Sequence, residues 1–130
     1  MNVADKEERI LAEMARSDES LKAAKNLLND ELFADSISRA YYAIFHAARA
    51  ILLTKDIDPE THNGAISLFG LHFVKPGIIE NKYGKIFNEA KDDRESSDYL
   101  IIRKFSKTEA QLRVNQATIF VSMAKMFLKV

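Results

Sequence analysis

The segment at residues 35–55, DSISRAYYAIFHAARAILLTK, constrains the fold more than any other part of the sequence. When the segment is placed on a helix, its apolar side chains recur at steps of three and four residues and line one broad face. These side chains are Ile37, Ala40, Tyr41, Ile44, Ala48, Ile51 and Leu52. We expect so apolar a helix to lie at the centre of the fold, with other helices packed around it.

A polar stripe follows the same steps along a second face of this segment. Its members are Arg39, Tyr42, His46 and Arg49. Imidazole exchanges protons near neutral pH and guanidinium stabilises a phosphate or a developing oxyanion, so the stripe suits nucleotide or phosphodiester chemistry. A simpler interpretation is a polar helix edge on which Tyr42 shields the core. The stripe is expected to meet another helix, a second subunit or a ligand.

Composition favours an all-α protein. The 130 residues include only four glycines and two prolines, and no alternating run bounded by turn residues indicates a strand. Residues 1–130 are expected to form one domain. The chain has no cysteine, its 19 basic and 19 acidic side chains cancel, and its first residues do not resemble a signal peptide. We therefore expect a cytoplasmic protein in which nucleic-acid binding would depend on a local patch.

The expected architecture is an up-and-down bundle of four longer helices and one shorter helix. The first covers residues 4–28, with a stripe close to 3.5 residues per turn formed by Ile10, Met14, Leu21, Ala24 and Leu28, and with Ser17 between Met14 and Leu21. The central helix follows. A third, shorter helix is expected to turn inward Ala65, Ile66, Phe69 and Phe73. The fourth helix, over residues 78–95, is expected to turn inward Ile79, Tyr83, Ile86, Phe87 and Ala90. Inward positions on the fifth are Ala110, Val114, Ala117, Phe120, Val121, Ala124, Phe127 and Leu128.

Start and stop signals delimit the later helices. Asp58-Pro59 predicts the start of the third helix, because Asp can accept from free amides and proline suits the first helical position. Pro76-Gly77 predicts its end. Ser106 and Glu109 have the spacing of a capping box and predict the start of the fifth helix.

Arg94 is a second candidate functional residue. It continues the apolar face of the fourth helix, and an isolated buried charge is costly, so an acid such as Asp98 is expected to meet it. Residues 94–106 lose helical periodicity and are expected to form a loop or a broken helix end. In one interpretation Arg94 and Asp98 lock this loop to the bundle, with Tyr99 as an apolar plug. In the other, Arg94 and Tyr99 reach a cleft and contact phosphate or base.

Other site classes find little support in the sequence. His62 and His72 are ten residues apart and lack a paired carboxylate motif, so we expect no metal site. The phosphate loops GxxxxGK[ST] and GxGxxG are both missing, which excludes nucleotide hydrolysis through a P-loop. We expect no cofactor and no membrane association.

Two motifs make the chain resemble the HEPN domain family, and more narrowly its small stand-alone prokaryotic members. They are SRAYYAIFHAARAILL at residues 38–53 and RESSDY at residues 94–99, followed by a long amphipathic C-terminal helix. The resemblance implies a bundle of four to five helices, usually dimeric and often paired with a minimal nucleotidyltransferase in a toxin-antitoxin or stress system.

The resemblance also implies a site. Many HEPN proteins are metal-independent ribonucleases that use an arginine and, further along the chain, a histidine with four to six residues between them. Arg39 and His46 satisfy that spacing but lie midway along the second helix. Arg94 has a suitable place, yet Tyr99 stands where the family has histidine. Tyrosine, with an ordinary pKa near 10, is a poor general base at neutral pH.

We therefore expect a binding or partner module rather than an enzyme, dimeric, paired with a nucleotidyltransferase and able to bind nucleotide or RNA. The dimer is expected because the central helix is otherwise too apolar for solvent. Candidate binding residues are Arg39, Tyr42, His46, Arg49, Arg94, Asp98 and Tyr99. One alternative is a metal-independent endoribonuclease using Arg39 and His46, or Arg94 with another partner. A second alternative is a structural homo-oligomer without a ligand.

Overall fold

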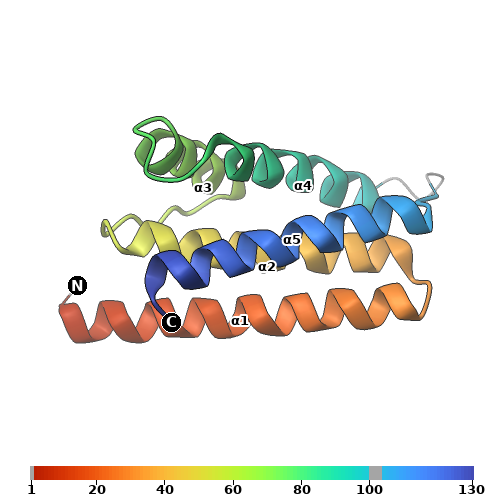
Figure 1. Ribbon diagram of the computed structural model, residues 1–130, viewed down its shortest axis with the longest axis horizontal. Coiled ribbons are helices and arrows are strands. Elements are labelled where there is room, and N and C mark those ends of the chain that lie inside the picture. Colours follow the sequence, from red (N-terminus) through yellow and green to blue (C-terminus); the bar gives the residue numbers. More distant parts are fainter. Residues whose placement is uncertain (1, 100–103) are drawn as a thin grey trace.

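The computed structural model describes residues 2–99 and 104–130, without the side chains of residues 96–99. This part of the chain is all-α, as predicted, with helices α1 (Val3–Asn29), α2 (Phe33–Leu53), α3 (His62–Phe69), α4 (Asn81–Tyr99) and α5 (Lys107–Leu128). A π-helical turn, η1 (Gly70–Val74), continues α3. The four long helices alternate in direction, with α1 and α4 running one way and α2 and α5 the other (Figure 1). Within the described ranges, no helix has the length and apolar character needed to cross a membrane.

Helix α2 lies at the centre, packed against α1, α5, α4 and α3. Every apolar residue that the sequence placed on its inner face is buried, and Tyr41, Ile51 and Leu52 are 0% exposed. The bundle itself covers this face. The apolar character of α2 is therefore no reason for a second subunit, contrary to the argument made from the sequence.

Two buried serines join α1 to α2. The hydroxyl of Ser17 donates to the carbonyl oxygen of Ala43 at 2.7 Å, and the hydroxyl of Ser36 donates to the carbonyl oxygen of Ala24 at 2.8 Å. Because each bond satisfies a hydroxyl that burial would otherwise leave without water, both serines can lie in the core. The predicted stripe on α1 packs inward: Met14, Leu21, Ala24 and Leu28 are buried, and Ile10 is half-buried against the core.

The predicted start of the third helix is wrong. Helix α3 begins at His62, and the Thr61 side chain caps it by accepting from the amide of Gly64. The Asp58 carboxylate, expected to cap this helix, instead accepts from two arginines, Arg9 and Arg49. The predicted stop is close to the observed end, because Lys75 follows η1 and Gly77 turns the chain with a φ of 80°.

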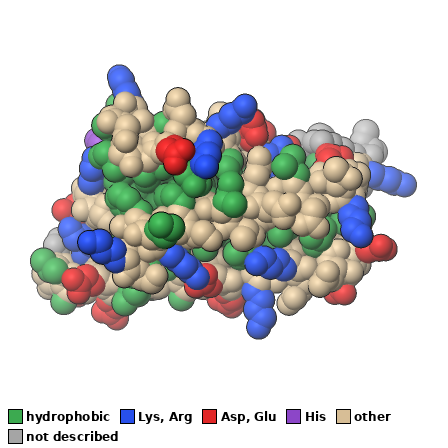
Figure 2. Space-filling view, in the orientation of Figure 1, with side chains coloured by type: hydrophobic (Ala, Val, Ile, Leu, Met, Phe, Trp, Pro, Cys, Tyr) green, Lys and Arg blue, Asp and Glu red, His purple; other side chains and the backbone are tan. Residues whose placement is uncertain are grey.

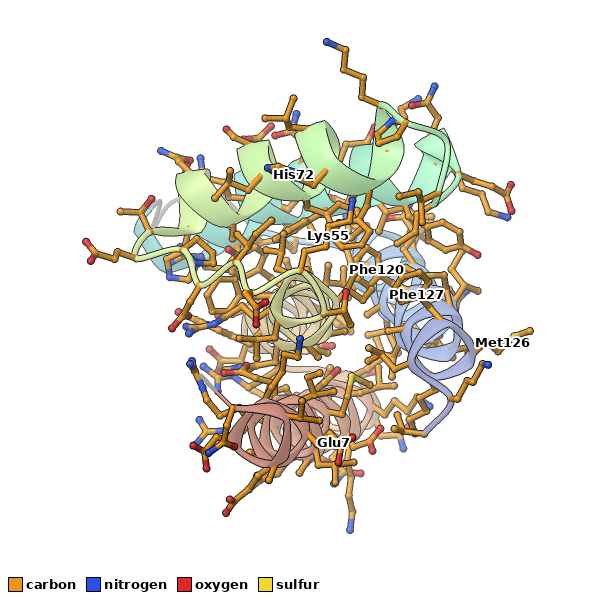
Figure 3. All side chains as sticks on the ribbon, turned by 90° about the vertical axis from the view of Figure 1, so that its left-hand side faces the viewer. Glu7, Lys55, His72, Phe120, Met126 and Phe127 are labelled. Atoms are coloured by element: carbon orange, nitrogen blue, oxygen red, sulfur yellow. The ribbon has the colours of Figure 1, made fainter. Side chains whose placement is uncertain are left out.

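Lys55 ties the end of α2 to η1. Its Nζ donates to the backbone carbonyl oxygen of His72 at 2.8 Å and lies 4.7 Å from the centroid of the Phe73 ring. Figure 3 shows Lys55 reaching toward η1 below His72. The His72 backbone therefore has a structural role at this end of the bundle.

The fourth and fifth helices follow their predicted faces but not all of their predicted bounds. Helix α4 begins at Asn81 and remains helical through Tyr99, so the expected loop does not begin at Arg94. The capping box at Ser106 and Glu109 is present and starts α5. Phe127, expected inward, is 36% exposed near the end of α5.

Candidate functional site

The polar stripe of α2 divides into two halves with different surroundings. Arg39 near the start of the helix is exposed, whereas Tyr42, His46 and Arg49 are half-buried. His46 and Arg49 face α1 and the α2–α3 loop, whereas Tyr42 lies against Arg94 of α4. Arg39 lies beside the Tyr42 ring and next to α1. Of the partners expected for the stripe, the structure shows neighbouring helices: α1 contacts His46, and α4 contacts Tyr42.

Acidic groups occupy the His46 and Arg49 half. Nδ1 of His46 lies 2.8 Å from Oε2 of Glu13, and Nε of Arg49 lies 3.6 Å from the other oxygen of that carboxylate. Arg49 also donates to Asp58 at 2.9 Å, and Arg9 donates to the second Asp58 oxygen at the same distance. The hydrogen bond from Arg9 is the main reason why the pKa of Asp58 is lowered. This network is a structural link between α1, α2 and the loop before α3.

Arg39 and Arg94 gather on the other half, around Tyr42. The guanidinium carbon of Arg39 lies 4.8 Å from the centroid of the Tyr42 ring, and that of Arg94 lies 5.7 Å from it. Arg94 also lies 5.1 Å from the Tyr41 ring centroid and is only 9% exposed. Such cation–π contacts lower the cost of placing a guanidinium beside apolar groups. The structure thus brings together Arg39, Tyr42 and Arg94, which the sequence identified in two separate motifs.

Tyr41 and His62 form a contact that the sequence pattern does not predict. Oη of Tyr41 lies 2.6 Å from Nδ1 of His62. Burial raises the pKa of the Tyr41 hydroxyl above its ordinary value, with the positive charge of Arg94 acting in the opposite direction. Burial also lowers the pKa of His62, and nearby cations led by Arg94 lower it further. A phenol on the most apolar helix needs a hydrogen-bond partner, and that need was the available signal.

Aromatic rings hold His62 and His46 close to this cluster. The His62 ring centroid is 4.4 Å from that of Phe45 and 6.1 Å from that of Tyr42, and the His46 ring is 6.5 Å from the Tyr42 ring. The chain therefore places Arg39, Arg94 and two histidines around one tyrosine. The side chains of Asp98 and Tyr99, the remaining predicted site residues, lie outside the described residues.

No cluster of His, Asp and Glu in the described residues is suited to hold a metal ion. The arrangement can instead bind an anion through its guanidiniums, and a planar base through its aromatic rings. A hollow of about 200 Å³ adjoins Arg39 and is lined by Arg16, Glu19, Ser20 and Ala23 of α1.

The described residues form an all-helical bundle, and the sequence carries, at residues 38–53 and 94–99, the two motifs that resemble the HEPN domain family. The sequence model of the HEPN domain matches residues 11–127, so the chain belongs to the HEPN domain family and the resemblance is confirmed.

Particular relatives are similar over nearly the whole chain. The chain is 42% identical over 125 residues to "Putative toxin MJ0605" of Methanocaldococcus jannaschii, a match that covers 96% of this chain and 92% of that protein. It is 33% identical over 113 residues to "Putative toxin MJ0142" of the same organism, covering 87% of this chain and 77% of that protein. It is 36% identical over 116 residues to "UPF0332 protein glr0978" of Gloeobacter violaceus, covering 88% and 92%.

Proposed function

We propose that this HEPN chain is a toxin-type module that binds RNA through Arg39, Tyr42 and Arg94 without cutting it. The observation that carries the proposal is the convergence of guanidiniums from two helices, α2 and α4, on the half-buried ring of Tyr42. Proteins bind single-stranded RNA by pairing cations with phosphates and by stacking bases on aromatic or guanidinium planes. Arg39 supplies the exposed cation, and the buried guanidinium of Arg94 packs against the same ring.

The charge balance of the two halves of the stripe supports this location. Arg39 forms no ion pair with any residue that the structure describes, and the hollow beside it carries one further arginine, Arg16, and one acid, Glu19. His46 and Arg49, in contrast, already bind Glu13 and Asp58. Although the chain has no net charge, this edge of the bundle therefore offers a local basic patch.

The proposed absence of cleavage rests on Tyr99 rather than on His46. Glu13 holds Nδ1 of His46 but leaves its Nε2 able to accept a proton. Tyr99 stands where the resemblance places the catalytic histidine. A metal-independent endoribonuclease is the second candidate, supported by the word "toxin" in the names of two relatives and by the position of His62 close to Arg94.

A binding assay with matched variants tests the proposal. Arg39→Ala should weaken binding of a fluorescein-labelled single-stranded RNA by about fivefold or more and reduce the salt slope of log K by about 0.7, because one phosphate contact is lost. Lys75→Ala removes the same charge from the exposed residue after η1, away from Tyr42, and should leave affinity unchanged. Equal effects of both substitutions, or no binding by the wild type, would contradict the proposal.

The same RNA decides between binding and cleavage. Incubated with the protein and EDTA, it should remain intact on a denaturing gel. Cleavage that disappears in His46→Ala or His62→Gln would establish the endoribonuclease alternative.

We further propose that the chain forms a homodimer through α5. Three exposed apolar side chains lie seven residues apart on this helix: Leu112, Ile119 and Met126, at 49%, 45% and 81% exposure. The charged residues of this stretch turn away, since Arg113 pairs with Asp93 and Glu89, and Lys125 with Asp18. Figure 2 shows mostly hydrophobic and neutral surface along α5, and Figure 3 shows Met126 projecting from the bundle.

A second copy fits this stripe because the spacing is symmetric about Ile119. An antiparallel pairing of two α5 helices would place Leu112 of each copy opposite Met126 of the other. Uncharged, apolar surface of this kind is typical of the centre of a protein interface.

A nucleotidyltransferase partner is proposed from the family resemblance. The neighbouring reading frame tests it: a small nucleotidyltransferase encoded there should copurify with this chain after coexpression. Failure of such a pair to copurify would contradict the partnership without affecting the RNA-binding proposal.

A further inference from the structure

The Tyr41–His62 contact fixes the imidazole at the edge of the candidate RNA site. Tyr41 is 0% exposed in the centre of α2, whereas His62 is half-buried at the first position of α3. Their hydrogen bond, 2.6 Å long, links positions that are 21 residues apart in the sequence. Because the rings of Phe45 and Tyr42 also pack against the imidazole, its orientation is set from several sides.

The hydrogens of this contact can be assigned from the neighbours. Tyr41 is 0% exposed, and His62 is the hydrogen-bond partner that the structure gives its hydroxyl, so the buried O–H needs Nδ1 as an acceptor. The Tyr41 O–H therefore donates to Nδ1 of His62. The raised pKa of Tyr41 keeps the phenol protonated, and the lowered pKa of His62 favours a neutral ring. A neutral imidazole that accepts at Nδ1 carries its hydrogen on Nε2.

The charged surroundings of His62 favour an anion. Arg94, Lys91 and Arg49, and His46 when protonated, all act on the imidazole as positive charges. Lys91 pairs with Glu95 at 3.0 Å, and Arg49 pairs with Asp58, so part of this charge is compensated. The donor hydrogen on Nε2 and the neighbouring cations nevertheless act in the same direction, since both stabilise a negatively charged oxygen.

We propose that His62 is an anion-binding residue whose Nε2–H, oriented by Tyr41, donates a hydrogen bond to a phosphate oxygen. The inference rests on the proposed RNA-binding function, because Arg39 and His62 both lie against Tyr42 and would contact one ligand. In this arrangement His62 holds its proton rather than taking one up. Tyr41 is a positioning residue, because it is buried and acts on the ligand only through the imidazole.

The first test reads the tautomer directly. Long-range ¹H–¹⁵N NMR spectra of the full chain at pH 7.5 should show His62 with its hydrogen on Nε2. Tyr41→Phe removes the donor to Nδ1 and should mix the two tautomers. A wild-type ring with its hydrogen on Nδ1 would overturn the inference whatever the protein binds.

The second test adds two probes, a uridine hexanucleotide and inorganic phosphate. The hexanucleotide should shift the His62 Nε2 resonance. His62→Phe should weaken hexanucleotide binding about tenfold or more, because a hydrogen bond to a charged group is lost. His62→Gln, whose amide can place a donor near the same point, should keep the affinity within about threefold of the wild type. If the wild type, His62→Gln and His62→Phe all bind the hexanucleotide with the same affinity, the inference is overturned.

These measurements separate the inference from the function on which it rests. Wild-type binding that Arg39→Ala weakens and His62→Phe does not would overturn only the role of His62. If the hexanucleotide does not bind at all, the RNA proposal fails and inorganic phosphate decides: a shift of the His62 Nε2 resonance supports a phosphate site for another ligand, and its absence overturns the inference.

Discussion

Oε2 of Glu13 lies 2.8 Å from Nδ1 of His46, and this contact joins α1 to the middle of the polar stripe on α2. Both side chains are largely buried, at 17% and 16% exposure. The other Glu13 oxygen lies 3.6 Å from Nε of Arg49, so one carboxylate serves two residues of the stripe. The pattern that suggested chemistry is therefore partly a helix-packing contact.

Replacing this carboxylate should reduce stability more than an exposed substitution on the same helix. Glu13→Ala removes the hydrogen-bond partner of His46 and one of the two carboxylates that pair with Arg49, which keeps Asp58. The substitution should lower the free energy of unfolding by about 1–2 kcal/mol in urea denaturation. Glu8→Ala, which changes an exposed residue of α1, should change it by less than about 0.5 kcal/mol. Indistinguishable urea midpoints for the two variants would show that the Glu13 contact contributes no stability.

The buried serines give a second prediction about the α1–α2 interface. Ser17→Ala and Ser36→Ala should each lower the free energy of unfolding by about 1 kcal/mol, because each removes a hydrogen bond to a backbone carbonyl of the facing helix. Ser122→Ala, at an exposed position of α5, is the matched control and should be nearly neutral. Stabilisation in either core variant would mean that apolar packing outweighs the hydrogen bond.

Local patterns predicted much of this fold because periodicity and capping depend on neighbouring residues. The inner face of α2 and the capping box at Ser106 and Glu109 agree with the structure. The start of the third helix was wrong for a physical reason. Asp58 has a suitable position to cap a helix, but Arg9 lies 49 residues away in the sequence and, together with Arg49, binds its carboxylate instead.

The site was less predictable because it depends on contacts between helices. The sequence identified Arg39, Tyr42 and Arg94, yet nothing in their spacing shows that both arginines lie on one ring. His62 was considered only as a metal ligand, and its contact with Tyr41 arises from the packing of α3 against α2. Helical continuity beyond Arg94 was also missed, because residues 94–99 are rich in turn-forming side chains while α4 remains helical through Tyr99.

The lowered pKa of His62 predicts how stability depends on pH. At pH values between the pKa of His62 in the folded protein and its ordinary value near 6.5, the unfolded chain binds more protons at His62 than the folded chain does. The free energy of unfolding therefore rises with pH in this range. The contribution is complete above pH 6.5 and is lost as the pH falls toward the folded pKa. Partial exposure limits it to a fraction of the roughly 1.4 kcal/mol that one pKa unit represents.

His62→Gln isolates this effect because glutamine does not titrate. Urea denaturation from pH 8 to pH 5 should show a wild-type free energy of unfolding that falls more steeply below pH 6.5 than that of the variant. Parallel curves for the two proteins would contradict the lowered pKa. The Asp58 carboxyl does not interfere, because its lowered pKa affects stability only below its ordinary value near 3.8.

The α5 stripe predicts the effect of single charges on assembly. In sedimentation velocity the wild type should behave as a dimer, and Ile119→Glu should yield a monomer because it places two like charges at the proposed two-fold axis. Leu71→Glu makes the same change at an apolar residue of η1 that is 52% exposed and should leave the dimer intact. Because the pairing sets Leu112 against Met126, glutamate at either position should weaken the dimer to a similar extent. A wild type that stays monomeric at all concentrations would exclude the dimer, and a dimer that survives Ile119→Glu would exclude α5 as its interface.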